Sequence, residues 1–204
     1  MVQEHNSSIS YYNKNAELFY KRTINSDMSE NYQKFLFRLK PLPSTILDLG
    51  CGVGRDARYF ENLGYDVTAI DGAEEMVCFA NEILKKPARL MLFREMNFTN
   101  EFDGIWAAAS LIHIPEEELE DVIYRIDRAL KPSGIFFATF KHGKGEYTQE
   151  GRTFYYMTEE SIRKYLAEGF EFIDVWKTED KTSSIAHSPD KMWLNILVRK
   201  KKEG

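Results

Sequence analysis

The chain has 204 residues, a length typical of one domain. Its 27 Lys and Arg against 32 Asp and Glu give a net charge of −5, which argues against binding nucleic acids or anionic membranes through a basic surface. Cys51 and Cys78 are too few for a disulfide scaffold, so we expect a reducing, cytoplasmic location. No apolar run approaches the roughly 20 residues of a membrane span, and residues 1–6 lack the features of a secretory signal.

Two helical patterns open the chain, at residues 9–21 and 26–39, and Pro41 and Pro43 stop the second. Apolar strand-like runs then alternate with amphipathic helical segments. The expected strands are 45–49, 67–70, 89–93, 102–110 and 135–140, with helices at 55–63, 73–85 and 115–130. A long loop over 141–153, a helix near 158–167, and two runs at 170–177 and 192–199 complete the chain.

The early strands are nearly continuous apolar runs, as expected for a sheet covered on both faces. Their alternation with helices predicts a parallel α/β sheet with right-handed crossovers. No helix separates the last two runs, so we expect them to form an antiparallel hairpin at the sheet edge. This combination favours a doubly wound fold over a (β/α)8 barrel, for which the chain is also short.

A glycine-rich turn follows the first strand, where Gly50, Gly52 and Gly54 lead directly into a helix. Glycine lets the backbone approach a ligand closely, and open α/β sheets bind ligands at this type of junction. Asp71 ends the next strand, 17 residues after Gly54, and its carboxylate suits the hydroxyls of a ribose. Residues 52–57 also match the dinucleotide pattern G-x-G-x-x-G/A, so a nicotinamide cofactor stays open, whereas a P-loop is excluded.

Four segments in chain order resemble the motifs of class I S-adenosylmethionine-dependent methyltransferases. They are ILDLGCGVG at 46–54, VTAIDGAEEM at 67–76, the fourth-strand motif within 102–115, and LKPSGI at 130–135. The likeness covers about residues 44–140 and points to the small, single-domain, type 11/25-like group. It implies a Rossmann-like, doubly wound seven-stranded sheet of order 3-2-1-4-5-7-6 with the last strand antiparallel. It also implies an N-terminal helical lid over residues 1–40 and a cofactor-binding domain over 41–204.

The resemblance implies S-adenosyl-L-methionine as the cofactor. The three glycines of the turn would bound its methionine portion, with Asp48 and Cys51 of the same motif beside them. Asp71 would hold the ribose, and Gly72 or Met76 would pack near the adenine. The family usually has an Asp after the third strand; here Asn97 stands in its place, next to Met96, and can still accept through its carbonyl oxygen.

Several further residues are candidates for chemistry. His113 follows the fourth strand and is a candidate general base, or else orients the turn before the next helix. Arg152 and Tyr156 follow the fifth strand and are candidate substrate contacts, the alternative being an ordinary solvated loop with packed aromatics. Tyr11 and Arg22 lie on the N-terminal helices, where they would either touch the cofactor or belong to a face packed on the core.

The composition adds an expectation about the lid, because the chain holds 14 Phe, 11 Tyr and 3 Trp. Seven aromatic residues fall in the two segments expected to cover the carboxyl edge of the sheet. They are Tyr11, Tyr12, Phe19, Tyr20, Phe154, Tyr155 and Tyr156. Aromatic faces there would exclude water and favour a sulfonium through cation–π attraction.

We therefore expect a methyltransferase that acts on a small-molecule acceptor, since the chain has no added recognition domain and no basic groove. Three alternatives remain at this point: an NAD(P)-dependent oxidoreductase, a non-catalytic S-adenosylmethionine-binding module, and an RNA or protein methyltransferase. No cysteine or histidine spacing typical of a metal site occurs, so no metal is expected.

Overall fold

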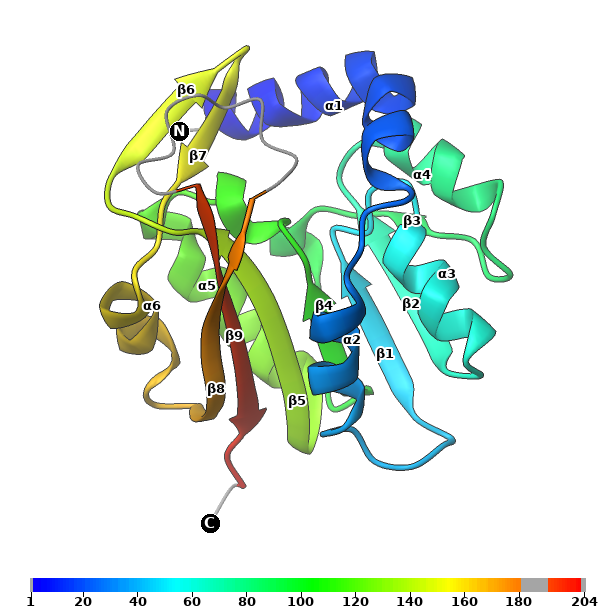
Figure 1. Cartoon of the computed structure of the whole chain (residues 1–204), viewed down its shortest axis with the longest axis vertical. Coiled ribbons are helices and arrows are strands. Elements are labelled where there is room, and N and C mark those ends of the chain that lie inside the picture. The colour runs from blue at the N-terminus through cyan, green and yellow to red at the C-terminus, as the bar shows by residue number, and fades with distance from the viewer. Residues whose placement is uncertain (1, 181–190, 203–204) are drawn as a thin grey trace.

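Five apolar segments form the parallel strands at the centre of the protein, in a computed structural model that describes residues 2–180 and 191–202 (Figure 1). They are β1 (Thr45–Leu49), β2 (Asp66–Asp71), β3 (Arg89–Leu90), β4 (Phe102–Ala107) and β5 (Leu130–Lys141). Two long strands, β8 (Phe170–Glu179) and β9 (Met192–Lys200), extend this sheet on the β5 side. Every residue of β4 is buried, as expected for a central strand covered on both faces.

The seven-stranded sheet has the order β3-β2-β1-β4-β5-β9-β8. Strands β1 to β5 pair in parallel, whereas β9 is antiparallel to both β5 and β8. This confirms the α/β fold and the strand order expected from the sequence. The order reverses beside β1, so the carboxyl ends of β1 and β4 lie at the point where such sheets bind ligands.

Helices cover both faces of the sheet (Figure 1). On one face lie α2 (Ser29–Leu36), α3 (Arg55–Asn62) and α4 (Glu74–Asn81), whose apolar residues pack with those of β1 and β2. On the other lie α5 (Glu116–Ala129) and α6 (Glu159–Leu166), which pack against β4 and β5. Short 3-10 turns, η1 (Phe93–Glu95) and η2 (Leu111–His113), follow β3 and β4.

The N-terminal helix α1 (Val2–Thr23) crosses above the carboxyl edge of the sheet, as the blue ribbon in Figure 1 shows. It is longer than the predicted helix over 9–21 and bends at Asn15, whose backbone is not helical (φ −122°, ψ 18°). The Asn15 side chain donates to the carbonyl of Tyr11 at 2.8 Å. An Asn side chain that bonds to the backbone in this way competes with helical geometry, which accounts for the bend.

A β-hairpin occupies the segment 141–153 that the sequence predicted as a loop, and that prediction is wrong. Strands β6 (Glu146–Gln149) and β7 (Arg152–Tyr155) pair antiparallel, with Gln149 opposite Arg152. The two residues of the turn have positive φ, 53° at Glu150 and 78° at Gly151. Two consecutive residues with positive φ make the type I′ turn that suits a two-residue hairpin, so this short signal outweighed the polar composition.

The third strand is shorter than the predicted 89–93. Only Arg89–Leu90 pair with β2, and both residues are exposed at the sheet edge. The backbone N–H of Leu92 instead donates to the Glu95 carboxylate at 2.8 Å, which closes the chain into η1. Edge strands of this kind lose pairing easily because only one neighbour supplies hydrogen bonds.

Two phenylalanines near the end of α2 give a matched test of the core. Phe35 is fully buried and lies 5.2 Å, centroid to centroid, from Trp106, whereas Phe37 is 81% exposed. Phe35→Ala should lower the free energy of unfolding by about 3–5 kcal/mol because it leaves a cavity. Phe37→Ala should change it by no more than about 0.5 kcal/mol. Urea denaturation of both variants measures the difference, and equal losses would contradict this packing.

Candidate active site

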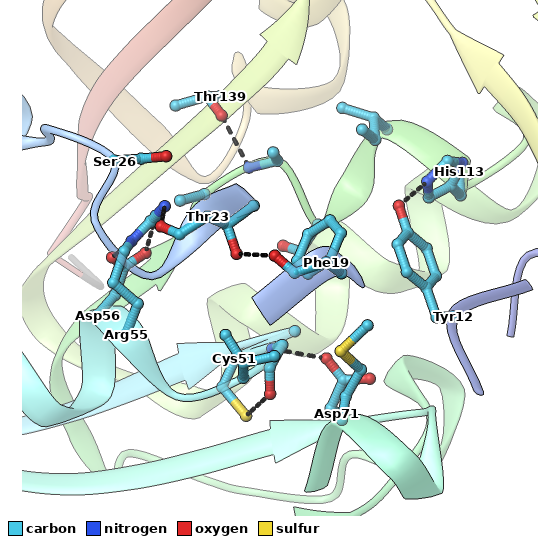
Figure 2. Close-up of a pocket in the computed structure, with 18 of the residues that line it drawn as sticks. Tyr12, Phe19, Thr23, Ser26, Cys51, Arg55, Asp56, Asp71, His113 and Thr139 are labelled. Atoms are coloured by element: carbon cyan, nitrogen blue, oxygen red, sulfur yellow. Dashed lines mark hydrogen bonds and ion pairs between the residues drawn. The ribbon is translucent and has the colours of Figure 1, made fainter. Parts of the chain in front are cut away.

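A cavity of about 770 Å³ lies at the carboxyl edge of the sheet, between the strands and α1 (Figure 2). Its walls come from the glycine turn after β1, the end of β2, the segment after β4, the end of β5, the β6–β7 hairpin, and β9. Segments distant in the sequence therefore meet in one pocket. Its volume is within the range usual for small-molecule sites.

The glycine turn is held against the end of β2. The backbone N–H groups of Gly50 and Cys51 both donate to the carbonyl of Ile70, each at 2.9 Å. Gly50 has φ +74°, and an added Cβ would lie 2.4 Å from the Cβ of Ser110, so no larger residue fits there. At Gly52, with φ +54°, a Cβ would point into the gap beneath the Phe19 ring, 3.6 Å away. The turn thus keeps its backbone open to the cavity.

Asp71 ends β2 with its carboxylate fixed by two backbone donors. One oxygen accepts from the N–H of Gly52 and the other from the N–H of Ala73, both at 2.8 Å. Burial raises the pKa of Asp71 above its usual value, although these N–H groups oppose the shift. The bond to Gly52, drawn in Figure 2, joins the predicted acidic residue to the predicted glycine turn.

Asp56 and its neighbour Arg55 connect the end of α1 to the sheet. Its carboxylate accepts from the Trp106 indole at 2.8 Å, from the Tyr32 hydroxyl, and from the Arg55 guanidinium at 2.6 and 2.9 Å. Arg55 also donates to the carbonyl of Thr23 at the end of α1, at 3.2 Å. The sequence analysis did not identify this hydrogen-bond network. The adjacent Arg and Asp directly after the glycine turn were the pattern that could have indicated it.

His113 lies between α1 and the β6–β7 hairpin and contacts both. Its Nδ1 lies 2.6 Å from the carbonyl of Thr153, and its Nε2 lies 2.8 Å from the hydroxyl of Tyr12 (Figure 2). Because a carbonyl only accepts, Nδ1 carries the proton in this arrangement, and Nε2 accepts from Tyr12. Burial raises the pKa of Tyr12 to about 12, which keeps its hydroxyl protonated as a donor. The Nε2 atom of the imidazole is therefore directed toward the cavity-lining Tyr12.

Ten of the predicted site residues line this cavity. They are Tyr11, Arg22, Gly50, Cys51, Gly52, Asp71, Gly72, Met76, His113 and Arg152. Of the aromatic residues expected in the lid, Tyr12, Phe19 and Phe154 line it as well as Tyr11, whereas Tyr20 stacks on Phe79 at 5.5 Å.

Five other predicted residues lie outside the cavity lining. Asp48 is buried behind the turn, where burial and then the Asp56 charge raise its pKa well above the usual range. Gly54 faces α4, where an added Cβ would lie 3.1 Å from Ala80. Tyr156 is buried beneath Gly143.

Met96 and Asn97 also lie away from the cavity. Met96 belongs to the core under α5, and Asn97 is exposed to solvent. The cavity wall at this level comes instead from Met91, Leu92 and Phe93. The shortened third strand explains the shift, because the chain turns into η1 before it reaches Asn97.

The family model of the methyltransferase domain matches residues 47–138, which run from the glycine turn to β5. The solved structure of a Burkholderia thailandensis 1,6-didemethyltoxoflavin N1-methyltransferase has the same fold, with a TM-score of 0.74 at 23% identity. The alignment covers 98% of this chain and 88% of that protein. Residues 47–138 thus match a methyltransferase domain, and the chain has the fold of the Burkholderia enzyme.

Curated relatives match the methyltransferase domain in part. A probable S-adenosyl-L-methionine-dependent methyltransferase, TehB of Haemophilus influenzae, is 33% identical over 86 residues, which are 40% of this chain and 30% of that protein. An uncharacterized methyltransferase of Staphylococcus carnosus is 26% identical over 162 residues, covering 72% of this chain and 77% of that protein. The chain thus spans less than a third of TehB.

The pocket of the methyltransferase domain fits S-adenosylmethionine, the methyl donor of this class. Gly52 leaves a cradle that any Cβ would fill, and Asp71 presents a fixed carboxylate to the same space. Ser110 also lines it, and its buried Oγ has no hydrogen-bond partner among residues 2–180 and 191–202. A buried hydroxyl without a partner is costly, so a ligand that bonds to it is favoured.

Within the described parts of the chain, no group of three or more His, Cys, Asp or Glu is arranged to hold a metal. In the same residues, no helix has the length and apolar character that a membrane crossing needs.

The contact between Tyr12 and His113 is testable by removal of one atom. Tyr12→Phe should lower the free energy of unfolding by about 1 kcal/mol because Nε2 of His113 loses its donor. Tyr20→Phe, on the same helix, is the control, because no hydrogen bond joins its hydroxyl to the described residues; it should change stability by less than about 0.5 kcal/mol. Urea denaturation measures the stability of both variants. Equal effects would contradict the hydrogen bond between Tyr12 and His113.

Proposed function

We propose that the protein is an S-adenosylmethionine-dependent methyltransferase that transfers a methyl group to a small-molecule acceptor. The observation that carries the proposal is the bond between Gly52 and Asp71, which brings the glycine turn and a half-buried carboxylate to one cavity beside the point where strand order reverses. When bound, the cofactor supplies a methyl group activated by a sulfonium, so the protein mainly positions the acceptor.

Each wall of the cavity has a proposed partner in the cofactor. Asp71 would accept from the ribose hydroxyls, and the open backbone at Gly50 and Gly52 would border the methionine portion. Met76 and Leu92 offer apolar contact for the adenine in place of Asn97. Arg22, at the end of α1, would pair with the carboxylate of the cofactor.

A small acceptor is favoured by the way the site is covered. Within residues 1–40, the segment expected to be the lid, α1 would take this role, whereas α2 packs on a face of the sheet. Both α1 and the β6–β7 hairpin lie above the carboxyl edge of the sheet (Figure 1) and contribute residues to the cavity lining. A net charge of −5 offers little attraction to nucleic acids. The Burkholderia enzyme of the same fold carries a small-molecule acceptor, 1,6-didemethyltoxoflavin, in its crystal structure.

His113 would serve as the general base for an acceptor that is protonated before transfer. Its Nδ1 is fixed by the carbonyl of Thr153, so Nε2 is the nitrogen that can take a proton, either directly or through the hydroxyl of Tyr12. We place the enzyme in the cytoplasm, because Cys78 is an exposed free thiol of the kind that a reducing compartment preserves.

Calorimetric titration with S-adenosylmethionine, S-adenosylhomocysteine and NAD tests the function directly. We expect binding of the first two and none of NAD; binding of NAD alone would indicate the oxidoreductase alternative. Incubation of a cell extract with methyl-labelled cofactor then separates the remaining classes. Label in small molecules supports the proposal, label in RNA or protein indicates a macromolecular acceptor, and no label indicates a non-catalytic module.

Asp71→Ala should weaken S-adenosylhomocysteine binding by about 1–3 kcal/mol, because it removes the proposed acceptor of the ribose hydrogen bonds. Asp66→Ala is the matched control, since Asp66 begins the same strand at the opposite edge and pairs with Lys86 in solvent. Calorimetry should give an unchanged affinity for this control. An unchanged affinity in Asp71→Ala would refute the ribose assignment.

His113→Gln should leave S-adenosylhomocysteine affinity intact and reduce label transfer to the small-molecule fraction by about 100-fold, the usual contribution of a general base. The readouts are calorimetry and the initial rate of label incorporation. A rate equal to that of the wild type would show that His113 only holds the lid in place.

A further inference from the structure

Two cations that are largely shielded from solvent, Lys141 and Arg152, line the cavity. Lys141 ends β5, and its side chain is 5% exposed. The Arg152 side chain on β7 is 12% exposed. The other charged residues of the lining that are shielded from solvent are Arg55 and Asp56, which pair with each other, and Asp71 at the glycine turn. Each of the two cations is paired with a carboxylate that lies outside the lining, Lys141 with Asp180 and Arg152 with Glu150.

Aromatic rings hold both cations from one side. The Arg152 guanidinium carbon lies 3.7 Å above the Tyr11 ring and 5.1 Å from the Phe154 ring. The Lys141 ammonium lies 3.9 Å above the Trp193 ring. A cation over a ring face is stabilised without using its N–H groups, so the donors at its edge remain available.

Both cations have few hydrogen bonds for groups so deeply placed. Arg152 donates through Nη2 to Glu150 at 3.0 Å, and that carboxylate is 57% exposed at the hairpin tip. The Nε of Arg152 is buried and has no hydrogen-bond partner among the described residues. Among the described residues, Lys141 donates to Asp180, which is one acceptor for a group with three donors.

The two cations also oppose each other. The Arg152 charge is one of the influences, after burial, that disfavour the charged form of Lys141. An oxyanion between or beside them would relieve this repulsion and satisfy the donors that they leave unused. Thr139 also lines the cavity, and because its Oγ1 accepts from the N–H of Ala109 at 2.8 Å, its own hydroxyl proton is directed elsewhere.

We propose that the methyl acceptor is a small molecule that carries an oxyanion, a carboxylate or a phosphate, and that Arg152 and Lys141 bind this group. This assignment rests on the proposed methyltransferase function and gives the class of its substrate. The aromatic supports fix the two cations, and the acid group then orients the acceptor within the cavity while another atom of it receives the methyl group.

The test uses the full chain saturated with S-adenosylhomocysteine and two probes of equal shape, anthranilate and anthranilamide. Calorimetry should show that anthranilate binds about tenfold more tightly than the neutral amide. Phenyl phosphate is titrated in parallel; whichever anion binds more tightly identifies the acid group, and either result supports the proposal. Equal binding of acid and amide, or binding of neither anion at millimolar concentration, would overturn it.

Variants connect the preference to the two side chains. Arg152→Gln should abolish the preference for acid over amide, and Lys141→Gln should reduce it. A folding defect would weaken both probes together, so the ratio of the two affinities is the informative readout, and an unchanged ratio in Arg152→Gln would overturn the assignment. If Lys141→Gln is too unstable to measure, because it leaves Asp180 buried without its cation, Arg152→Gln alone decides.

Two surface residues supply matched controls. Arg163 lies 4.0 Å above the Phe172 ring and pairs with Glu159 at 2.7 Å, the same arrangement as Arg152 but away from the cavity. Lys34 lies 4.2 Å above the Trp176 ring and pairs with Asp174 at 2.7 Å, which reproduces Lys141. Arg163→Gln and Lys34→Gln should keep the tenfold preference.

Binding of S-adenosylhomocysteine is measured first. If it does not bind, the proposed function is refuted. If it binds but the anion is not preferred over the amide, only the acceptor class is refuted.

Discussion

The buried carboxylate of Asp56 joins the parts of the molecule that make the site. It accepts hydrogen bonds from Tyr32 of α2 and Trp106 of β4, and it pairs with Arg55. Burial alone would favour the neutral acid, but the Arg55 guanidinium and these donors hold the pKa of Asp56 below its usual value. Loss of Arg55 would leave an uncompensated charge in the core, and loss of Tyr32 or Trp106 would remove one of the hydrogen bonds to it.

The Asp56 network is connected to α1 through Arg55. Arg55 reaches the carbonyl of Thr23 at one end of α1, and His113 receives the hydroxyl of Tyr12 in its other half. The helix therefore crosses the cavity between two fixed points, with Phe19 above Gly52. The proposed cofactor and acceptor would meet beneath a cover that is anchored by buried polar contacts on both sides.

Local signals explain most of what could be predicted. The strand order and the glycine turn were predicted correctly, because the apolar runs, the spacing from Gly54 to Asp71 and the resemblance to class I methyltransferases agree with one another. The β6–β7 hairpin was missed, although Glu150 and Gly151 form its turn, because a polar, glycine-rich segment is also typical of a loop. The position of Asn97 was predicted wrongly because the third strand, at the edge of the sheet, pairs only over Arg89 and Leu90.

The sequence by itself determined the sheet, the turn and the acidic residue that faces it, because each depends on residues near one another in the chain or on a period of two or 3.6 residues. Only the tertiary structure decided the Asp56 network, the contact of Tyr12 with His113, and the gathering of Arg152 and Lys141 in the lining of the cavity. These contacts join segments up to 101 residues apart, as Tyr12 and His113 are, and no local pattern encodes which distant partner completes a buried polar group.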